Sequence, residues 1–328
     1  MSTTPHLAVD DVRTVAQLAG LAPSVHNTQP WRFTWDGQRF DVLEDRTRAL
    51  PVLDRSGRER AVSIGAAGLH ARLGFAGLGW DTTTTLLPDG DDGEVHVRLQ
   101  VNGPRASLPE ELELVAAIPR RGTDRDPYDE RPVPDDVLVA VESAAGAEGG
   151  WTHVVSADDL VELEVLLAHA DTAQRKDPAY LEELAAWRRD DGAGVSTRSL
   201  PTVDPSARGS SLSLRDFDAA AGPPRAAQPA QTPPAEHPTV LVIGTQHDTR
   251  GDWILSGFVL GRVLLQATVE GVAAQPVSSV LEVPMLRGRL RNTLRLVGYP
   301  QMVLRMGYGT AGPVSHRLPV DELLTVQT

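Results

Sequence analysis

Residues 22–33 have the sequence Ala-Pro-Ser-Val-His-Asn-Thr-Gln-Pro-Trp-Arg-Phe. A segment with helical periodicity precedes them, and the aromatic residues at their end open a segment that alternates as a strand does. Pro23 ends the helix, and Ser24, Asn27 and Gln29 then follow within one turn. Because buried polar side chains need hydrogen-bonding partners, a flat heterocycle with carbonyls and ring nitrogens is one predicted partner. The alternative is a polar turn that only joins helix to strand.

The composition limits the class of protein. The chain has 328 residues, of which 41% are hydrophobic and 23% charged, as in a globular enzyme. Its net charge of −13 argues against a nucleic-acid or anionic-membrane partner. The absence of cysteine excludes disulfides and thiolate metal ligands, and the nine histidines have no metal-ligand spacing. We therefore expect a cytoplasmic protein, without a secretory leader and without a metal site.

The order of elements repeats along the chain and predicts an α+β fold. The first set is helix, two strands, long helix and two strands, at residues 10–21, 31–35, 40–44, 56–77, 82–87 and 94–101. The second set has helices at 134–147, 157–175, 178–189 and 251–270, with strands at 151–155, 239–244 and 300–306. Because residue-level similarity between the sets is weak, the repeat is a hypothesis that rests on this order.

Residues 190–238 interrupt the second set with many glycines and prolines. A loop of this length is usually a functional lid or a disordered linker, and both remain open here. Residues 210–221 could hold a short helix within it.

A basic segment lies between the two sets. Arg120, Arg121, Thr123 and Arg125 stand within six residues and offer donors suited to a phosphate dianion. Arginine suits this task because its planar fork binds phosphate oxygens in pairs. The alternative is a solvated turn whose arginines pair with the neighbouring aspartates.

Together these motifs resemble the nitroreductase superfamily. The pattern P-S-x-x-N-x-Q-P-W is similar to the family's flavin-contacting turn, and R-x-T-x-R, followed by Pro132-Val133-Pro134, is similar to its FMN phosphate clamp. The resemblance implies FMN as cofactor, with nearly the whole chain matched except 190–238. It implies contacts to the flavin ring from Pro23, Ser24, Asn27 and Gln29, and contacts to the phosphate end and pyrimidine edge from Arg121, Thr123 and Arg125, with Arg120 as a helper.

The order of the two motifs is inverted with respect to a single family subunit. The first half carries the turn and lacks a basic clamp, whereas the second half carries the clamp and has residues 144–151, Ala-Ala-Gly-Ala-Glu-Gly-Gly-Trp, where its own turn would stand. This arrangement resembles the actinobacterial Acg-like branch, in which two family-like halves are fused. It implies a pseudo-dimer of residues 1–105 and 106–328 with one complete FMN site per chain.

Two later segments extend the resemblance. Residues 275–279, expected to end the second long helix, are similar to the segment that faces flavin N5, which adds Pro276, Ser278 and Ser279 to the implied cofactor contacts. Ser278 and Ser279 replace the usual Glu-Gly there. Arg317 resembles the basic tail group that closes on the phosphate, and its alternative is an exposed tail arginine.

The resemblance implies an oxidoreductase that passes hydride from NAD(P)H through FMN to a small acceptor. No protein side chain is predicted to be catalytic, since the flavin carries the chemistry and the protein contributes placement and electrostatics. The alternatives are an FMN-binding or storage protein with a lid over the flavin, and a flavin-free interaction protein that kept the fold. A monomer or a homodimer is compatible with a fused chain.

Overall fold

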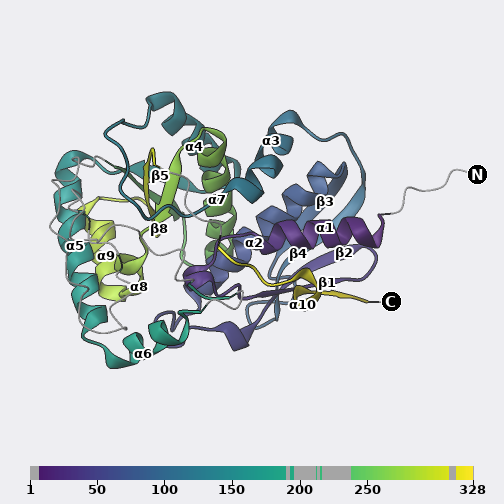
Figure 1. Ribbon diagram of the computed structural model, residues 1–328, viewed down its shortest axis with the longest axis horizontal. Helices are drawn as coiled ribbons and strands as arrows, with labels where there is room; N and C mark the ends of the chain where they lie inside the picture. The colour runs from purple at the N-terminus through teal and green to yellow at the C-terminus, as the bar shows by residue number, and fades with distance from the viewer. Residues whose placement is uncertain are drawn as a thin grey trace, which may run out of the picture.

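Two β-sheets flank a central pair of long helices in the computed structural model (Figure 1). The structure describes residues 7–189, 193–195, 212, 215, 238–309 and 315–327. The short helix expected at 210–221 lies outside the described residues, apart from Leu212 and Arg215. The central helices are α2 (Arg58–Gly77) and α7 (Arg250–Val269), and they confirm the two long helices of the predicted repeat.

The first sheet is built mainly by the N-terminal part of the chain. Its strands run in the order β3-β4-β2-β1-β9. They are β1 (Trp31–Trp35), β2 (Arg39–Glu44), β3 (Trp80–Leu86), β4 (Val95–Pro104) and β9 (Leu324–Val326). Neighbours are antiparallel, except that β9 pairs in parallel with β1. The buried rings of Trp31, Phe33 and Phe40 face a core shared with α1 (Val9–Gly20) and α2.

The second sheet has the order β5-β6-β8-β7 and is entirely antiparallel. Its strands are β5 (Trp151–Val154), β6 (Thr239–Thr245), β7 (Ala273–Pro276) and β8 (Tyr299–Gly307). Alternate residues of β6 enter different cores, as the pleat requires: Leu241 packs with α7 and Val242 packs with α5 (Ala157–Arg175). The remaining helices of this part are α4 (Asp135–Ala147), α6 (Pro178–Ala186), α8 (Ser279–Glu282) and α9 (Pro284–Thr293).

The two sheets follow one plan. Read from the outer edge, β3-β4-β2-β1 in the first sheet corresponds to β7-β8-β6-β5 in the second, with α2 and α7 in equivalent places in the chain order. The predicted α+β class is confirmed. The following elements were not predicted: α3 (Pro109–Ala117), η1 (Val25–Asn27), η2 (Arg46–Arg48), η3 (Ile118–Arg120), α8, α9, α10 (Val320–Leu323) and strands β7 and β9.

The central helices touch through glycine. A Cβ added to Gly65 of α2 would lie 1.9 Å from the carbonyl oxygen of Ile254, and one added to Gly257 of α7 would lie 2.0 Å from that of Val62. Only glycine permits the backbones to approach this closely. Helix α7 is long and apolar enough to cross a membrane by length and composition, but 61% of its apolar window is buried against the rest of the protein.

The C-terminal segment returns to the first sheet. Strand β9 pairs Leu324 with Phe33 of β1, so the chain ends beside the element that follows the polar turn. This return places residues 315–318 next to that turn, where they contribute to the site described below.

Candidate functional site

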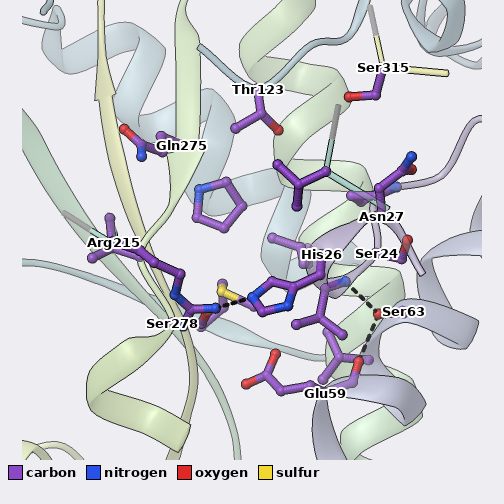
Figure 2. Close-up of a pocket in the computed structure, with 18 of the residues that line it drawn as sticks. Ser24, His26, Asn27, Glu59, Ser63, Thr123, Arg215, Gln275, Ser278 and Ser315 are labelled. Atoms are coloured by element: carbon purple, nitrogen blue, oxygen red, sulfur yellow. Dashed lines mark hydrogen bonds between the residues drawn. The ribbon is translucent and has the colours of Figure 1, made fainter. Parts of the chain in front are cut away.

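A single cavity gathers the segments that the sequence singled out. It encloses about 1050 Å³ of space free of atoms, counting its open mouth, and its lining includes the first two turns of α2 and Leu260 of α7 (Figure 2). Its walls come from the polar turn, α2, the basic segment, strand β7 and the C-terminal tail. The predicted residues among its lining are Pro23, Ser24, Asn27, Arg121, Thr123, Arg125, Pro276, Ser278, Ser279 and Arg317.

The polar turn has an unusual backbone. The φ angles of His26, Asn27 and Gln29 are 47°, 52° and 50°, which places all three in the left-handed region. This conformation is energetically unfavourable for any residue other than glycine. Only two other non-glycine residues in the described part of the chain share it. Strain of this kind concentrates where a backbone is shaped for a ligand, so the turn is a candidate site on conformational grounds alone.

Internal hydrogen bonds hold the turn in this shape. The Ser63 hydroxyl of α2 accepts from the Val25 amide at 3.2 Å and donates to the carbonyl of Glu59 at 2.8 Å. The Ser24 hydroxyl accepts from the amide of Gln29 at 3.0 Å. Gln29 does not line the cavity. Its side chain is fully buried, and the side-chain oxygen Oε1 accepts from the Leu318 backbone amide at 2.9 Å. Gln29 therefore fastens the C-terminal tail to the turn.

Asn27 joins three segments that are distant in sequence. Its amide nitrogen donates to the carbonyls of Gly194 at 3.1 Å and His316 at 3.0 Å, and its Oδ1 accepts from Arg317 at 2.9 Å. The backbone amide of Gly194 donates in return to the Asn27 carbonyl at 3.0 Å. A ligand that hydrogen-bonds to the Asn27 side chain must share or displace these contacts.

Arg121 and Arg317 form the positive end of the cavity. Arg121 is only 7% exposed, and the Nε atoms of both arginines are buried without a hydrogen-bond partner. Burial lowers the pKa of Arg121 to about 10, and burial together with the nearby charge of Arg121 lowers that of Arg317 to about 9. Their other contacts are to oxygens such as the Leu21 carbonyl, and neither pairs with a carboxylate of the described residues.

The rest of the basic segment divides into two parts. Thr123 and Arg125 line the cavity with Arg121 (Figure 2 shows the Thr123 hydroxyl directed into it). Arg120 is exposed, is not among the lining residues, and donates from Nε to the Ala116 carbonyl at 3.2 Å.

Residues 275–279 lie on strand β7 and at the start of α8. The expectation that they end the second long helix was wrong: α7 ends at Val269, and Gly271, with φ of 71°, reverses the chain before β7. Pro276, Ser278 and Ser279 still line the cavity, together with Gln275. The Ser278 hydroxyl donates to Glu282 at 2.7 Å.

Sequence reasoning missed a buried charged pair at the cavity wall. Arg215, from the segment 190–238, bonds from Nη2 to Oε1 of Glu282 at 2.6 Å, and the side chain of Glu282 is 1% exposed. Arg215 also contacts Nε2 of His26 (Figure 2). Burial and the charge of Arg215 lower the pKa of His26 to about 3, so this imidazole, which lines the cavity, is neutral.

Glu59 is a buried acid in the lining that was not predicted. It is 4% exposed, belongs to the first turn of α2 and pairs with Arg58. Burial raises the pKa of Glu59 to about 7, against the opposing effect of Arg58. No motif marks it, because its position follows from where α2 begins relative to the turn.

The cavity as a whole combines three surfaces. One end has two buried guanidiniums whose Nε–H groups have no acceptor among the described residues, and part of the wall is apolar (Val25, Val62, Val195, Leu260, Pro276, Val277 and Met302). The remaining lining carries amide and hydroxyl groups together with His26, Glu59, Arg125 and Arg215. Such a site fits a phosphate joined to a flat, polar-edged ring system. The residues present therefore fit FMN.

Comparison with known proteins shows the family to which the chain belongs. No family model matches the chain. Over 305 residues it is 35% identical to "Putative NAD(P)H nitroreductase Rv3131" of Mycobacterium tuberculosis, covering 91% of this chain and 85% of the relative. It is 27% identical over 329 residues to "Putative NAD(P)H nitroreductase acg" of the same organism, covering 98% and 97%.

Among solved structures, one named a putative nitroreductase from Anabaena variabilis superposes with a TM-score of 0.45 at 9% identity, over 92% of this chain and 88% of that one. The sequence match to the mycobacterial relatives is the stronger of these likenesses and extends through both halves of the chain. The chain belongs to the nitroreductase superfamily, in its Acg-like branch.

Proposed function

We propose that the protein is an FMN-dependent oxidoreductase of nitroreductase type that binds one FMN per chain in the cavity described above. The observation that carries the proposal is the pair Arg121 and Arg317, whose buried Nε–H groups meet no acceptor in the part of the chain that the structure describes. Leaving two cations buried in this way is costly unless an anion binds between them. A phosphate monoester supplies the charge and the acceptor oxygens.

Each lining group has a role in this proposal. Arg121, Thr123 and Arg317 hold the phosphate end, and Arg125 lies toward the pyrimidine edge. Pro23, Ser24 and Asn27 bound the ring on the side of the turn, and Pro276, Ser278 and Ser279 bound it on the side of β7. Gln29 acts indirectly by fastening the tail to the turn, and Arg120 lies outside the set.

When bound, FMN supplies the transfer of hydride from NAD(P)H to a small acceptor. The chain's own residues bind and orient the cofactor and exclude water from its buried end. The neutral His26 adds no charge beside the ring, because its Nε2 accepts from Arg215. The cationic arginines stabilise negative charge that accumulates at the cofactor during reduction.

A second candidate function is FMN binding or storage with restricted turnover. Two observations favour it: Gly194 bonds the turn residue Asn27, and Arg215 enters the cavity wall to pair with Glu282. Both residues come from the segment 190–238, so its described residues occupy one rim of the cavity. If they stay in place with FMN bound, they limit the approach of nicotinamide to the ring.

The two candidates are separated by anaerobic reduction. Holoprotein is mixed with NADH or NADPH under argon, and the loss of flavin absorbance is followed in time. Complete bleaching within seconds to minutes supports the oxidoreductase. Flavin that stays oxidised with NAD(P)H, yet is reduced by dithionite, supports the binding protein.

We also propose the finer points that the resemblance implies. The chain is a fused pseudo-dimer whose halves meet at α2 and α7, and the common strand order of the two sheets supports this. Its boundary near residue 105 precedes α3. The protein acts in the cytoplasm as a monomer or homodimer, on NAD(P)H and a small acceptor, without nucleic acid or membrane.

A further inference from the structure

Gln275 and Arg305 face each other across the antiparallel pair β7 and β8. Directly opposed residues of such a pair have side chains on the same face of the sheet and can touch. Here Nη1 of Arg305 donates to Oε1 of Gln275 at 2.8 Å. Arg305 is fully buried, whereas Gln275 lines the cavity.

Arg305 is held from two further sides. Its Nη2 donates to the Asp126 carbonyl at 3.0 Å, and its guanidinium carbon lies 3.8 Å from the centre of the Tyr128 ring. Tyr128 is 2% exposed and packs against Gly307, where an added Cβ would lie 2.5 Å from the ring. A guanidinium held in this way keeps its Nη1–H donor against the side chain of Gln275.

This contact determines which way the amide of Gln275 points. A guanidinium has only donors, so the atom of Gln275 that meets it must be the carbonyl oxygen. The amide nitrogen then lies on the other side, and no hydrogen-bond partner is found for it among the described residues. Gln275 lines the same cavity as Thr123 and Asn27, and all three are labelled in Figure 2.

We infer that Gln275 is a cofactor-contacting donor, whose amide N–H is presented to an acceptor at the edge of the bound ring, and that Arg305 is the positioning residue that fixes its orientation. The inference rests on the proposed function, in which FMN fills this cavity. The acceptors that a flavin offers at its edge are carbonyl oxygens and unprotonated ring nitrogens. Electron density at these atoms rises on reduction, so a donor here favours the reduced cofactor.

The sharpest test is Gln275→Glu. The carboxylate keeps an acceptor for Arg305, so the buried guanidinium stays paired, but it offers no donor to the ring and adds a negative charge. Gln100→Glu, the same change on a half-buried residue of β4 away from the cavity, is the matched control. Dissociation constants for FMN are measured by fluorescence titration of the apoproteins, and midpoint potentials by dye-coupled reductive titration.

We expect Gln275→Glu to weaken FMN binding by roughly tenfold or more, as loss of one hydrogen bond to a ligand implies, and Gln100→Glu to leave it unchanged. If the variant weakens binding of reduced FMN more than binding of oxidised FMN, the midpoint potential falls. The fall is about 30 mV for each tenfold difference between the two losses of affinity. Unchanged affinity and potential in folded Gln275→Glu overturn the inference. Failure of the unmodified protein to bind FMN overturns the proposed function instead.

A second pair of variants covers the case in which Gln275→Glu fails to fold. Gln275→Leu combined with Arg305→Met removes donor and clamp together, so that no buried cation loses its partner at this contact. The double variant is expected to show the same loss of affinity. Arg305→Lys keeps a donor for Oε1 and is expected to retain the potential of the unmodified protein, whereas Arg305→Met alone lowers it. Equal midpoint potentials for Arg305→Lys and Arg305→Met overturn the positioning role of Arg305.

Discussion

Arg121 and Arg317 bring two guanidiniums to the same end of one cavity from opposite ends of the second half of the chain. Both donate to the Leu21 carbonyl oxygen, and no carboxylate of the described residues pairs with either. The pair is stable in the folded chain because the surrounding packing enforces it. This relationship supports the proposal that an anion binds in the cavity.

Removal of one of these cations should weaken the binding of FMN, which carries a phosphate, but not the binding of riboflavin, which has none. Arg121→Met is expected to weaken FMN binding by about 10- to 100-fold, the effect of one or two charge-assisted hydrogen bonds, and to leave riboflavin binding unchanged. The matched control is Arg120→Met, which changes the adjacent exposed arginine and should affect neither ligand. Isothermal titration of both flavins checks this. Equal losses for FMN and riboflavin would show that Arg121 acts on the fold and not on phosphate.

The glycine contact between α2 and α7 predicts a large loss of stability on a small substitution. Gly257→Ala would place a methyl group 2.0 Å from the Val62 carbonyl oxygen and must push the two helices apart. We expect a loss of about 1 to 3 kcal/mol or more in the free energy of unfolding. Gly288→Ala in α9 meets no atom within 4 Å and should be neutral or stabilising by about 0.5 kcal/mol. Urea denaturation of the two apoproteins compares them, and similar midpoints would contradict the close helix crossing.

Glu59 predicts a dependence of stability on pH. Burial raises its pKa to about 7 from an ordinary value of 4.5, with Asp54 and Glu282 adding to the rise and Arg58 and Arg215 opposing it. The folded protein therefore retains a proton that the unfolded chain releases. The retained proton therefore adds at most about 3 kcal/mol to the free energy of unfolding. This stabilisation is fully present below about pH 4.5 and is lost as the pH rises through 7.

Glu59→Gln removes this ionisation. Its melting temperature, compared with that of the unmodified apoprotein at the same pH, should therefore be raised more at pH 8 than at pH 5. Thermal melting at the two pH values measures it. Glu142→Gln, which changes an exposed glutamate of α4, controls for the lost charge and should show no such difference. A Glu59→Gln effect of the same size at both pH values would contradict the raised pKa.

The pair Arg215 and Glu282 predicts restricted access to the site. Arg215→Gln with Glu282→Gln removes both charges at once, so that neither buried charge loses its counter-charge in this pair. If the pair holds one rim of the cavity, the double variant should be reduced by NAD(P)H several-fold faster and release FMN faster. Stopped-flow absorbance measures both rates. Unchanged rates would show that the pair is only structural, and Arg39→Gln, in the exposed pair with Asp36, is the control.

The sequence motifs located most of this site because they are local. The polar turn, the segment from Arg121 to Arg125 and the tail arginine each contain their own signal, and the structure brings all three to one cavity. Gln29 could not be distinguished from its neighbours, since its internal bond to Leu318 depends on the return of the C-terminal tail.

The remaining features depend on pairing between distant segments. Strand β7 has four residues and ends in proline, so it has too little periodicity to be recognised. The contact of Gln275 with Arg305 follows from the register of β7 on β8, and that of Arg215 with Glu282 from the path of a long irregular segment. Neither register nor path is encoded in local pattern.

The central claim is that one composite site per chain binds FMN, and the amount of flavin in the purified protein tests it most directly. Protein reconstituted with excess FMN and freed of unbound ligand is denatured by heat, and the released flavin is quantified against the protein concentration. The account predicts about one FMN per chain, lost in Arg121→Met combined with Arg317→Met. No flavin in the unmodified protein would contradict the site, and about two per chain would contradict its assembly from both halves.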